Sequence, residues 1–239
     1  MSLTLVIGNK NYSSWSMRAW LVLKQANLAF TEQRVRFDSF DAQSQFKQSL
    51  LAINPIGKVP VLLDSSLGPD TAIWDTLAIC EYLAERYPDS QLWPADTADR
   101  ARARSLCAEM HAGFGALRSL CPMNIEAVLP DVGARLWRDN AHLRDDVQRL
   151  ISLWRHQFLR SGGPLLFGNF TIADAYFAPV CLRLTTYALP LPDDVQAYVT
   201  HVLALPSVVA WVSAALAEHD FLPFEEPYRT RASPVPSVA

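Results

Sequence analysis

A proline at position 60 lies between two valines in the segment Asn-Pro-Ile-Gly-Lys-Val-Pro-Val-Leu at residues 54–62. The valines favour a β-strand, but proline has no N–H to donate and occurs in sheets only at an edge, a first residue or a bulge. A cis Val59–Pro60 bond fits this pattern, because it turns the chain and leaves the backbone of Val59 free to pair with an extended peptide. An ordinary edge-strand proline after an Asn-Pro turn fits these residues equally well.

The residues that follow predict a hairpin and then a helix. Residues 65–70 read as a turn and residues 71–74 as a short returning strand. A helix then begins at Asp75 and Thr76 and ends before Pro88. Its first turn carries side-chain oxygens and free N–H groups, so we expect the start of this helix to accept a carboxylate.

The rest of the chain divides into a mixed part and a helical part. An apolar run at Leu3–Ile7 predicts a buried strand, and a helical period begins at Ser14 and stops near Asn27. Residues 30–37 predict a second strand, which a right-handed crossover makes parallel to the first. Residues 87–94 contain two prolines and read as a linker. Helical segments are expected at residues 43–48, 96–120, 132–160 and 207–218, and from residue 171 onward with Pro179 inside.

Two motifs, more than a hundred residues apart, resemble the soluble glutathione transferases. Residues 54–62, followed by an acidic-hydroxyl pair that opens a helix with the pattern Leu-Ala-Ile-Cys-Glu-Tyr-Leu at residues 77–83, resemble the glutathione-binding half of that family. Phe-Thr-Ile-Ala-Asp at residues 170–174 resembles the capping-box signature of its helical domain. The motifs stand in the family's order, and the resemblance covers nearly the whole chain.

The resemblance implies a two-part fold. We expect an α/β thioredoxin-like N-terminal domain, in which helices cover a mixed four-stranded sheet, followed by an all-α helical bundle. The expected division is a glutathione-binding domain at residues 1–88, a linker at 89–98, a helical domain that carries the electrophile site at 99–226, and a flexible tail at 227–239.

The resemblance also assigns roles in binding glutathione. The backbone of Val59, beside Pro60, would pair with the cysteinyl backbone of the tripeptide. The N–H and hydroxyl of Thr76 would hold the γ-glutamyl carboxylate, and Asp75 would pair with the γ-glutamyl ammonium. Lys58 would reach the glycyl carboxylate, although an exposed lysine serves as often as a solvated surface charge.

The thiol-activating group is expected between the first strand and the first helix. Residues 11–18 resemble the serine-type site of the zeta class and of related bacterial members, in which a donor at a helix N-terminus stabilises the thiolate. The register of the comparison leaves three candidates: Ser13 first, then Asn11 and Ser14. The alternative is that these residues only cap the helix.

The electrophile site is expected between the two domains, on the inner face of the first long helix. Met110, His111, Phe114 and Arg118 occupy neighbouring positions there. Arg118 would bind an anionic substrate or form a salt bridge to another helix, and a histidine such as His111 is more often structural than an acid-base group.

The predicted function is that of a glutathione transferase, which conjugates the glutathione thiolate to a small electrophile. One alternative is the glutathione-dependent isomerisation of a maleyl-type diacid. Another is a non-catalytic module that kept the fold for protein association. The resemblance also implies a homodimer.

Composition excludes other classes of function. The net charge of −3 disfavours nucleic acid as a partner. No signal peptide and no run of roughly 20 apolar residues is visible, so we expect a cytoplasmic protein without a membrane partner. The five histidines show no metal-ligand spacing, and no metal is expected. No cysteine pair has C-x-x-C spacing, which predicts buried, reduced thiols at Cys80, Cys107, Cys121 and Cys181.

Overall fold

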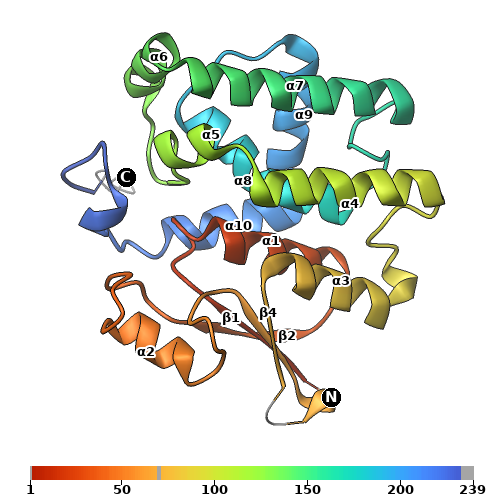
Figure 1. Cartoon of the computed structure of the whole chain (residues 1–239), viewed down its shortest axis with the longest axis vertical. Coiled ribbons are helices and arrows are strands. Elements are labelled where there is room, and N and C mark those ends of the chain that lie inside the picture. The colour runs from red at the N-terminus through yellow and green to blue at the C-terminus, as the bar shows by residue number, and fades with distance from the viewer. Residues whose placement is uncertain (1, 69–70, 233–239) are drawn as a thin grey trace, which may run out of the picture.

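The computed structural model describes residues 2–68 and 71–232. Its first part is a mixed four-stranded sheet with strand order β2-β1-β3-β4, shown in Figure 1. Strand β1 (Leu3–Ile7) pairs in parallel with β2 (Phe30–Arg34) and antiparallel with β3 (Val61–Asp64), which pairs antiparallel with β4 (Ala72–Trp74). The predicted parallel β-α-β unit and mixed sheet are therefore confirmed, although β2 ends three residues earlier than expected.

The sheet is covered on both faces because its strands alternate between two cores. Leu5 and Ile7 pack with α1 (Ser14–Gln25) and α3 (Thr76–Arg86). Val6, between them, packs in a second core with residues of α2 (Gln45–Leu51). Side chains alternate along a strand, so a five-residue strand serves both layers. We call this part, from β1 to α3, the sheet half.

The remaining helices form a helical half, which lies on the α1 and α3 side of the sheet (Figure 1). Helix α1 is buried between the sheet and the helical half, and it packs against α8 and α10. The helices of this half are α4 (Thr97–Ala112), α5 (Gly115–Leu120), α6 (Pro130–Asp139), α7 (Ala141–Ser161), α8 (Ile172–Thr186), α9 (Asp193–Leu203) and α10 (Pro206–Leu216). Short 3-10 turns lie at Ser65–Leu67, Pro88–Ser90 and Pro223–Glu225.

Two of the predicted helices are broken in the structure. The helix expected at residues 96–120 stops at Ala112 and restarts at Gly115, because Phe114 adopts a left-handed conformation with φ 55°. The helix expected at 132–160 is interrupted at Asn140, whose backbone is extended. Helix α9 was not predicted. The turn expected at residues 65–70 contains a 3-10 helix, and its residues 69–70 lie outside the described part.

Helix α8 begins with the predicted capping box. The backbone N–H of Thr171 donates to Asp174 Oδ2 over 2.9 Å, and the reciprocal contact to the Thr171 side chain is also present. Asp174 is fully buried and also accepts from the N–H of Leu166 and the hydroxyl of Tyr198. One carboxylate thus fixes the start of α8, the loop before it and α9. Pro179 lies inside α8, as expected.

After α10 the chain returns to the sheet half. Asp220 accepts from both Arg36 and Asn9, and the hydroxyl of Tyr12 donates to Glu226 over 2.7 Å. The hydroxyl of Tyr228 donates to Leu120 O over 2.8 Å. The first residues of the expected flexible tail are therefore anchored, whereas residues 233–239 lie outside the described part. We call residues 218–229 the C-terminal strap.

The four cysteines are buried and free. Within residues 2–68 and 71–232, no single helix is long and apolar enough to cross a bilayer; α9 and α10 reach that threshold only as a pair bent by 70°.

Replacement of Asp174 with alanine should destabilise the protein by roughly 3 kcal/mol or more. The change leaves two buried N–H groups and the Tyr198 hydroxyl without an acceptor, and each such group costs about 1–3 kcal/mol. Urea unfolding followed by circular dichroism measures the effect. Glu85→Ala, on the exposed side of α3, is the control and should change stability by less than about 0.5 kcal/mol. Equal losses in both variants would contradict the assigned role of Asp174.

Candidate functional site

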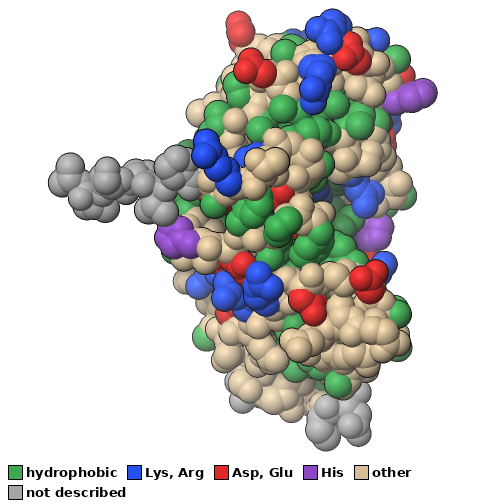
Figure 2. Space-filling view, turned by 90° about the vertical axis from the view of Figure 1, so that its left-hand side faces the viewer, with side chains coloured by type: hydrophobic (Ala, Val, Ile, Leu, Met, Phe, Trp, Pro, Cys, Tyr) green, Lys and Arg blue, Asp and Glu red, His purple; other side chains and the backbone are tan. Residues whose placement is uncertain are grey.

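A cleft follows the junction between the sheet half and the helical half. Figure 2 shows hydrophobic side chains gathered across the middle of one face of the molecule, between these halves. Three pockets adjoin in the cleft because Trp15, in the first turn of α1, lines all of them. Each pocket brings together residues that are far apart in the sequence.

The first pocket, which we call the strand-side pocket, is lined by all five residues predicted to bind glutathione. These are Lys58, Val59, Pro60, Asp75 and Thr76. The Val59–Pro60 bond is cis. Neither backbone group of Val59 has a hydrogen-bond partner within the described residues, and strand β3 begins only at Val61. The pocket therefore contains an unpaired length of backbone that an extended peptide can use.

The start of α3 forms the opposite wall of the strand-side pocket. Asp75 has φ 72°, an uncommon value for a residue with a side chain, and its Oδ1 accepts from the N–H groups of Leu77 and Ala78. Its Oδ2 faces His111 Nε2 at 3.5 Å. The hydroxyl of Thr76 was expected to hold a ligand carboxylate. It donates instead to Trp15 O over 3.2 Å, so its hydrogen is already used. The N–H of Thr76 has no partner among the described residues.

The start of α1 places two of the three candidate thiol activators in the cleft. The hydroxyl of Ser13 donates to Ser16 Oγ over 2.7 Å, and Ser16 Oγ also accepts from the N–H of Gly8. Ser14 Oγ accepts from Arg183 Nη2 over 3.3 Å. The hydrogen of the Ser14 hydroxyl thus remains available to a ligand, and Ser14 is the freer donor of the two.

Asn11, the third candidate, lies away from the three pockets. Its Nδ2 donates to Asn124 Oδ1 over 3.1 Å, and its Oδ1 accepts from the N–H of Glu126 over 2.8 Å. Both ends of the amide are therefore used to hold the loop that follows α5. This placement argues against a role for Asn11 in thiol activation.

The four residues predicted for the electrophile site have two different outcomes. Met110 and Phe114 are buried in the core and line none of the three pockets. The first long helix ends at Ala112, so the expected helix face does not continue through Phe114. His111 and Arg118 do line the strand-side pocket. Arg118 forms no ion pair within the described residues; it donates to the carbonyls of His111 and Gly113 at the end of α4.

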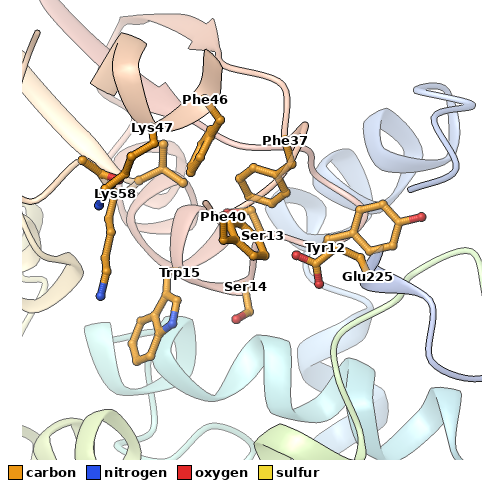
Figure 3. Close-up of a pocket in the computed structure, with 12 residues that line it drawn as sticks. Tyr12, Ser13, Ser14, Trp15, Phe37, Phe40, Phe46, Lys47, Lys58 and Glu225 are labelled. Carbon is orange, nitrogen blue, oxygen red and sulfur yellow. Dashed lines mark hydrogen bonds between the residues drawn. The ribbon is translucent and has the colours of Figure 1, made fainter. Parts of the chain in front are cut away.

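A second pocket, which we call the aromatic pocket, was not predicted. Figure 3 shows the rings of Phe37 and Phe46 on the side of the pocket opposite Ser14 and Trp15. The two phenyl rings meet edge to face at 4.8 Å. Lys47 also lines this pocket, but its ammonium donates to the carbonyls of Ile56 and Gly57. Phe46 and Lys47 come from a polar segment in which the sequence indicated only a helical turn, and Phe37 is the last residue of the predicted second strand. Phe40 belongs to the same pocket.

The third pocket, the arginine cavity, contains charged groups that were not predicted either. Arg18 and Arg183 line it and are 1% and 7% exposed. Burial lowers the pKa of Arg18 to about 9 and that of Arg183 to about 10. Glu225, from the C-terminal strap, lines the cavity as well. The signal available in the sequence was an arginine inside each of two largely apolar helices.

Known proteins match this chain in both sequence and structure. Residues 12–86 match the family model described as "Glutathione S-transferase, N-terminal domain". The chain is 32% identical over 182 residues to glutathione S-transferase 1 of Dianthus caryophyllus. This match covers 75% of this chain and 76% of the relative. A crystal structure of a glutathione transferase homologue from Burkholderia gl BGR1, with bound glutathione, superposes with a TM-score of 0.66 at 27% identity, over 91% of this chain and 99% of that one.

A further relative matches over a shorter stretch of the chain. The chain is 36% identical over 107 residues to a probable maleylacetoacetate isomerase of Caenorhabditis elegans, 45% of each protein. The chain spans less than half the length of the first curated relatives that it matches.

The stability of the protein should fall as the pH rises through the titration range of Glu225. Burial raises the pKa of this carboxyl from 4.5 to about 7; Arg183 opposes the shift and Glu226 adds to it. Between these two values the folded protein holds a proton that the unfolded chain has released, so the free energy of unfolding decreases with pH. Urea unfolding from about pH 4.5 to about pH 8 should show this slope in the wild type and a flatter one in Glu225→Gln. Parallel profiles for these two proteins would contradict the assignment, and Glu85→Gln is the exposed control.

Proposed function

Because the chain belongs to the glutathione S-transferase family, we propose that it conjugates the thiolate of glutathione to a small electrophilic substrate. The observation that supports this function best is the convergence of three features in one cleft. They are the unpaired backbone of Val59, the start of α3 and the serine hydroxyls at the start of α1.

The strand-side pocket suits the peptide part of glutathione. The free N–H and C=O of Val59 would pair with the cysteinyl backbone of the tripeptide. The N–H of Thr76, with the dipole of α3 behind it, would bind the γ-glutamyl carboxylate. Asp75 Oδ2 is not used in capping and would accept from the γ-glutamyl ammonium. The glycyl carboxylate is assigned to Lys58, which forms no ion pair within the described residues.

The reaction requires the thiol to be a thiolate at neutral pH. A Ser14 hydroxyl that donates to sulfur, at the N-terminus of α1 and beside the buried charge of Arg183, favours the deprotonated form. The sulfur lone pair then forms a bond to the electrophilic carbon, and the leaving group departs with the electrons of the bond that breaks. The protein positions both reactants and lowers the pKa of the thiol.

Glutathione-dependent isomerisation is the second candidate activity. It is favoured by the match to the probable maleylacetoacetate isomerase of Caenorhabditis elegans. The thiolate would add to a carbon–carbon double bond and leave again after rotation, so the same cleft would serve. A purely protein-binding role has less support, because it requires neither an unpaired strand edge nor a serine donor beside it.

The same proposal assigns different roles to the parts of the chain. We assign glutathione binding to residues 1–88 and the electrophile side of the cleft to residues 99–226, with a linker at 89–98. A homodimer in the cytoplasm, with no nucleic-acid or membrane partner, is the form in which we expect the protein to act.

Removal of the Ser14 hydroxyl should raise the pKa of bound glutathione toward that of the free tripeptide. Absorbance of the thiolate, titrated with pH in the presence of saturating protein, measures this value. We expect a clear rise in Ser14→Ala, a smaller one in Ser13→Ala and none in Ser105→Ala, which removes an exposed serine of α4. Bound glutathione with an unshifted pKa in the wild type would exclude the thiolate mechanism, whereas a rise only in Ser13→Ala would reassign the donor.

Replacement of Lys58 with methionine should weaken glutathione about fivefold, since an exposed ion pair contributes up to about 1 kcal/mol. The effect should disappear for glutathione whose glycyl carboxylate is esterified, because the lysine then has no anion to bind. Isothermal titration calorimetry with glutathione and with its glycyl ester, on the wild type and on Lys58→Met, measures the coupling between the lysine and the carboxylate. Lys24→Met, an exposed lysine of α1, is the control. A wild-type protein that binds both ligands equally would refute the contact.

A further inference from the structure

The arginine cavity lies between the start of α1, helix α5 and helix α8. Each of these elements contributes one arginine to its lining: Arg18, Arg118 and Arg183. Ser14 and Trp15 line it too, so the cavity adjoins both the expected position of the thiol and the strand-side pocket. None of the five residues assigned to glutathione binding lines it.

The three guanidinium groups have no carboxylate partner within the described residues. Arg18 donates to the carbonyls of Tyr176 and Ser14, at 2.9 and 3.0 Å. Arg183 donates to main-chain carbonyls at the end of α5 and to Ser14 Oγ, and its buried Nε has no partner. Carbonyl and hydroxyl oxygens satisfy some of the donors, but they do not neutralise the positive charge that a guanidinium retains.

A buried cation without a counter-ion is costly, and proteins usually pair such groups. Arg18 and Arg183 are almost inaccessible to water, and burial lowers the pKa of each. Glu225 is the one acid in the cavity lining within the described chain, and it forms no ion pair with any of the three arginines. Burial raises its pKa to about 7, so it compensates their charge only in part at neutral pH.

We propose that the arginine cavity binds a carboxylate of the second substrate, so that this enzyme acts on anionic electrophiles. The proposal rests on the transferase function, because it specifies which electrophile reaches the thiolate. A carboxylate matches the planar fork of a guanidinium with two parallel hydrogen bonds. It would supply the counter-charge that Arg18 and Arg183 lack.

The position of the cavity sets the geometry of the substrate. A carboxylate held by Arg183 is anchored next to Ser14, since Arg183 donates to Ser14 Oγ over 3.3 Å. The reactive carbon of a small electrophile would then lie between this anchor and the sulfur. For 4-chloro-3-nitrobenzoate, the sulfur lone pair forms the C–S bond at the carbon that bears chlorine, and chloride leaves with the electrons of the C–Cl bond.

Binding of an unreactive pair of ligands tests the cavity independently of turnover. Isothermal titration calorimetry compares 3-nitrobenzoate with 3-nitrobenzamide, its neutral analogue, in the presence of saturating S-methylglutathione. The wild type should bind the anion at least about tenfold more tightly, as a charge-assisted contact implies. If the anion binds only when S-methylglutathione is absent, the cavity serves a carboxylate of glutathione itself and the proposal fails. Equal affinities for the two ligands would also overturn it.

Variants of the arginines assign the effect to residues. Arg183→Met should reduce the preference for the anion to about one, and Arg183→Lys should restore part of it, because lysine keeps the charge without the fork. Arg118→Gln, at a half-buried position, should lower the preference without the risk of a core substitution. Arg138→Gln, an exposed arginine of α6, is the matched control and should leave it unchanged.

The stability of the Arg183 variant shows whether Arg183 binds the anion or only supports the fold. Arg183→Met removes a buried cation without a counter-ion, but it also removes a donor from the carbonyls of Arg118 and Cys121. Its urea unfolding is therefore measured beside the anion preference, and Arg118→Gln carries the test if Arg183→Met does not fold. A variant that unfolds more easily yet keeps the anion preference would show that Arg183 is structural, which would overturn the proposal.

Turnover distinguishes this inference from the proposed function. We measure kcat/KM for 4-chloro-3-nitrobenzoate and for 4-chloro-3-nitrobenzamide. Each value is divided by the rate constant of the same compound with free glutathione in solution. The normalised value for the anion should exceed that for the amide about tenfold or more. Turnover of both without preference refutes the anionic substrate and leaves the transferase intact. No turnover of either, with the binding preference retained, refutes the transferase and leaves the carboxylate site.

Discussion

The two halves of the molecule depend on one buried cation at their junction. Arg18 of α1 donates to a carbonyl of α8 and to the carbonyl of Ser14, and its guanidinium lies 4.4 Å from the ring centre of Trp15. It therefore joins the sheet half to the helical half and fixes the first turn of α1, from which the cleft is built. The same charge has no carboxylate partner among the described residues, so a residue that fixes the geometry of the site also contributes to its positive potential.

The elements with local signals could be predicted from the sequence. The apolar run of β1, the capping box of α8 and the acidic start of α3 each depend on residues within one or two turns of chain. The breaks at Phe114 and Asn140 could not be predicted in this way, because neither residue type requires a non-helical backbone. After each break the chain continues as a new helix with tertiary contacts of its own, α5 against α7 and α7 against α6, and such contacts leave no local signal in the sequence.

The residues of the candidate site also divide into those with a local signal in the sequence and those placed by tertiary packing. Val59 and Asp75 belong to contiguous motifs, and the family resemblance of these motifs assigned both residues to one ligand; the strand-side pocket is lined by both. Met110 was assigned to the cleft because it neighbours His111 and Phe114 in the expected helix, and it lies in the core instead. Arg183 and Glu225 reach the site only through tertiary packing, and no spacing in the sequence connects them with Ser14.

The C-terminal strap is synthesised last, so the cleft can be completed only at the end of translation. The hydroxyl of Tyr12 meets Glu226 across 214 positions of the chain, and Glu225 beside it completes the wall. A ribosome adds about 5–20 residues per second, so roughly ten to forty seconds of synthesis separate the two sides. A nascent chain thus carries its serine donors long before the opposite wall exists.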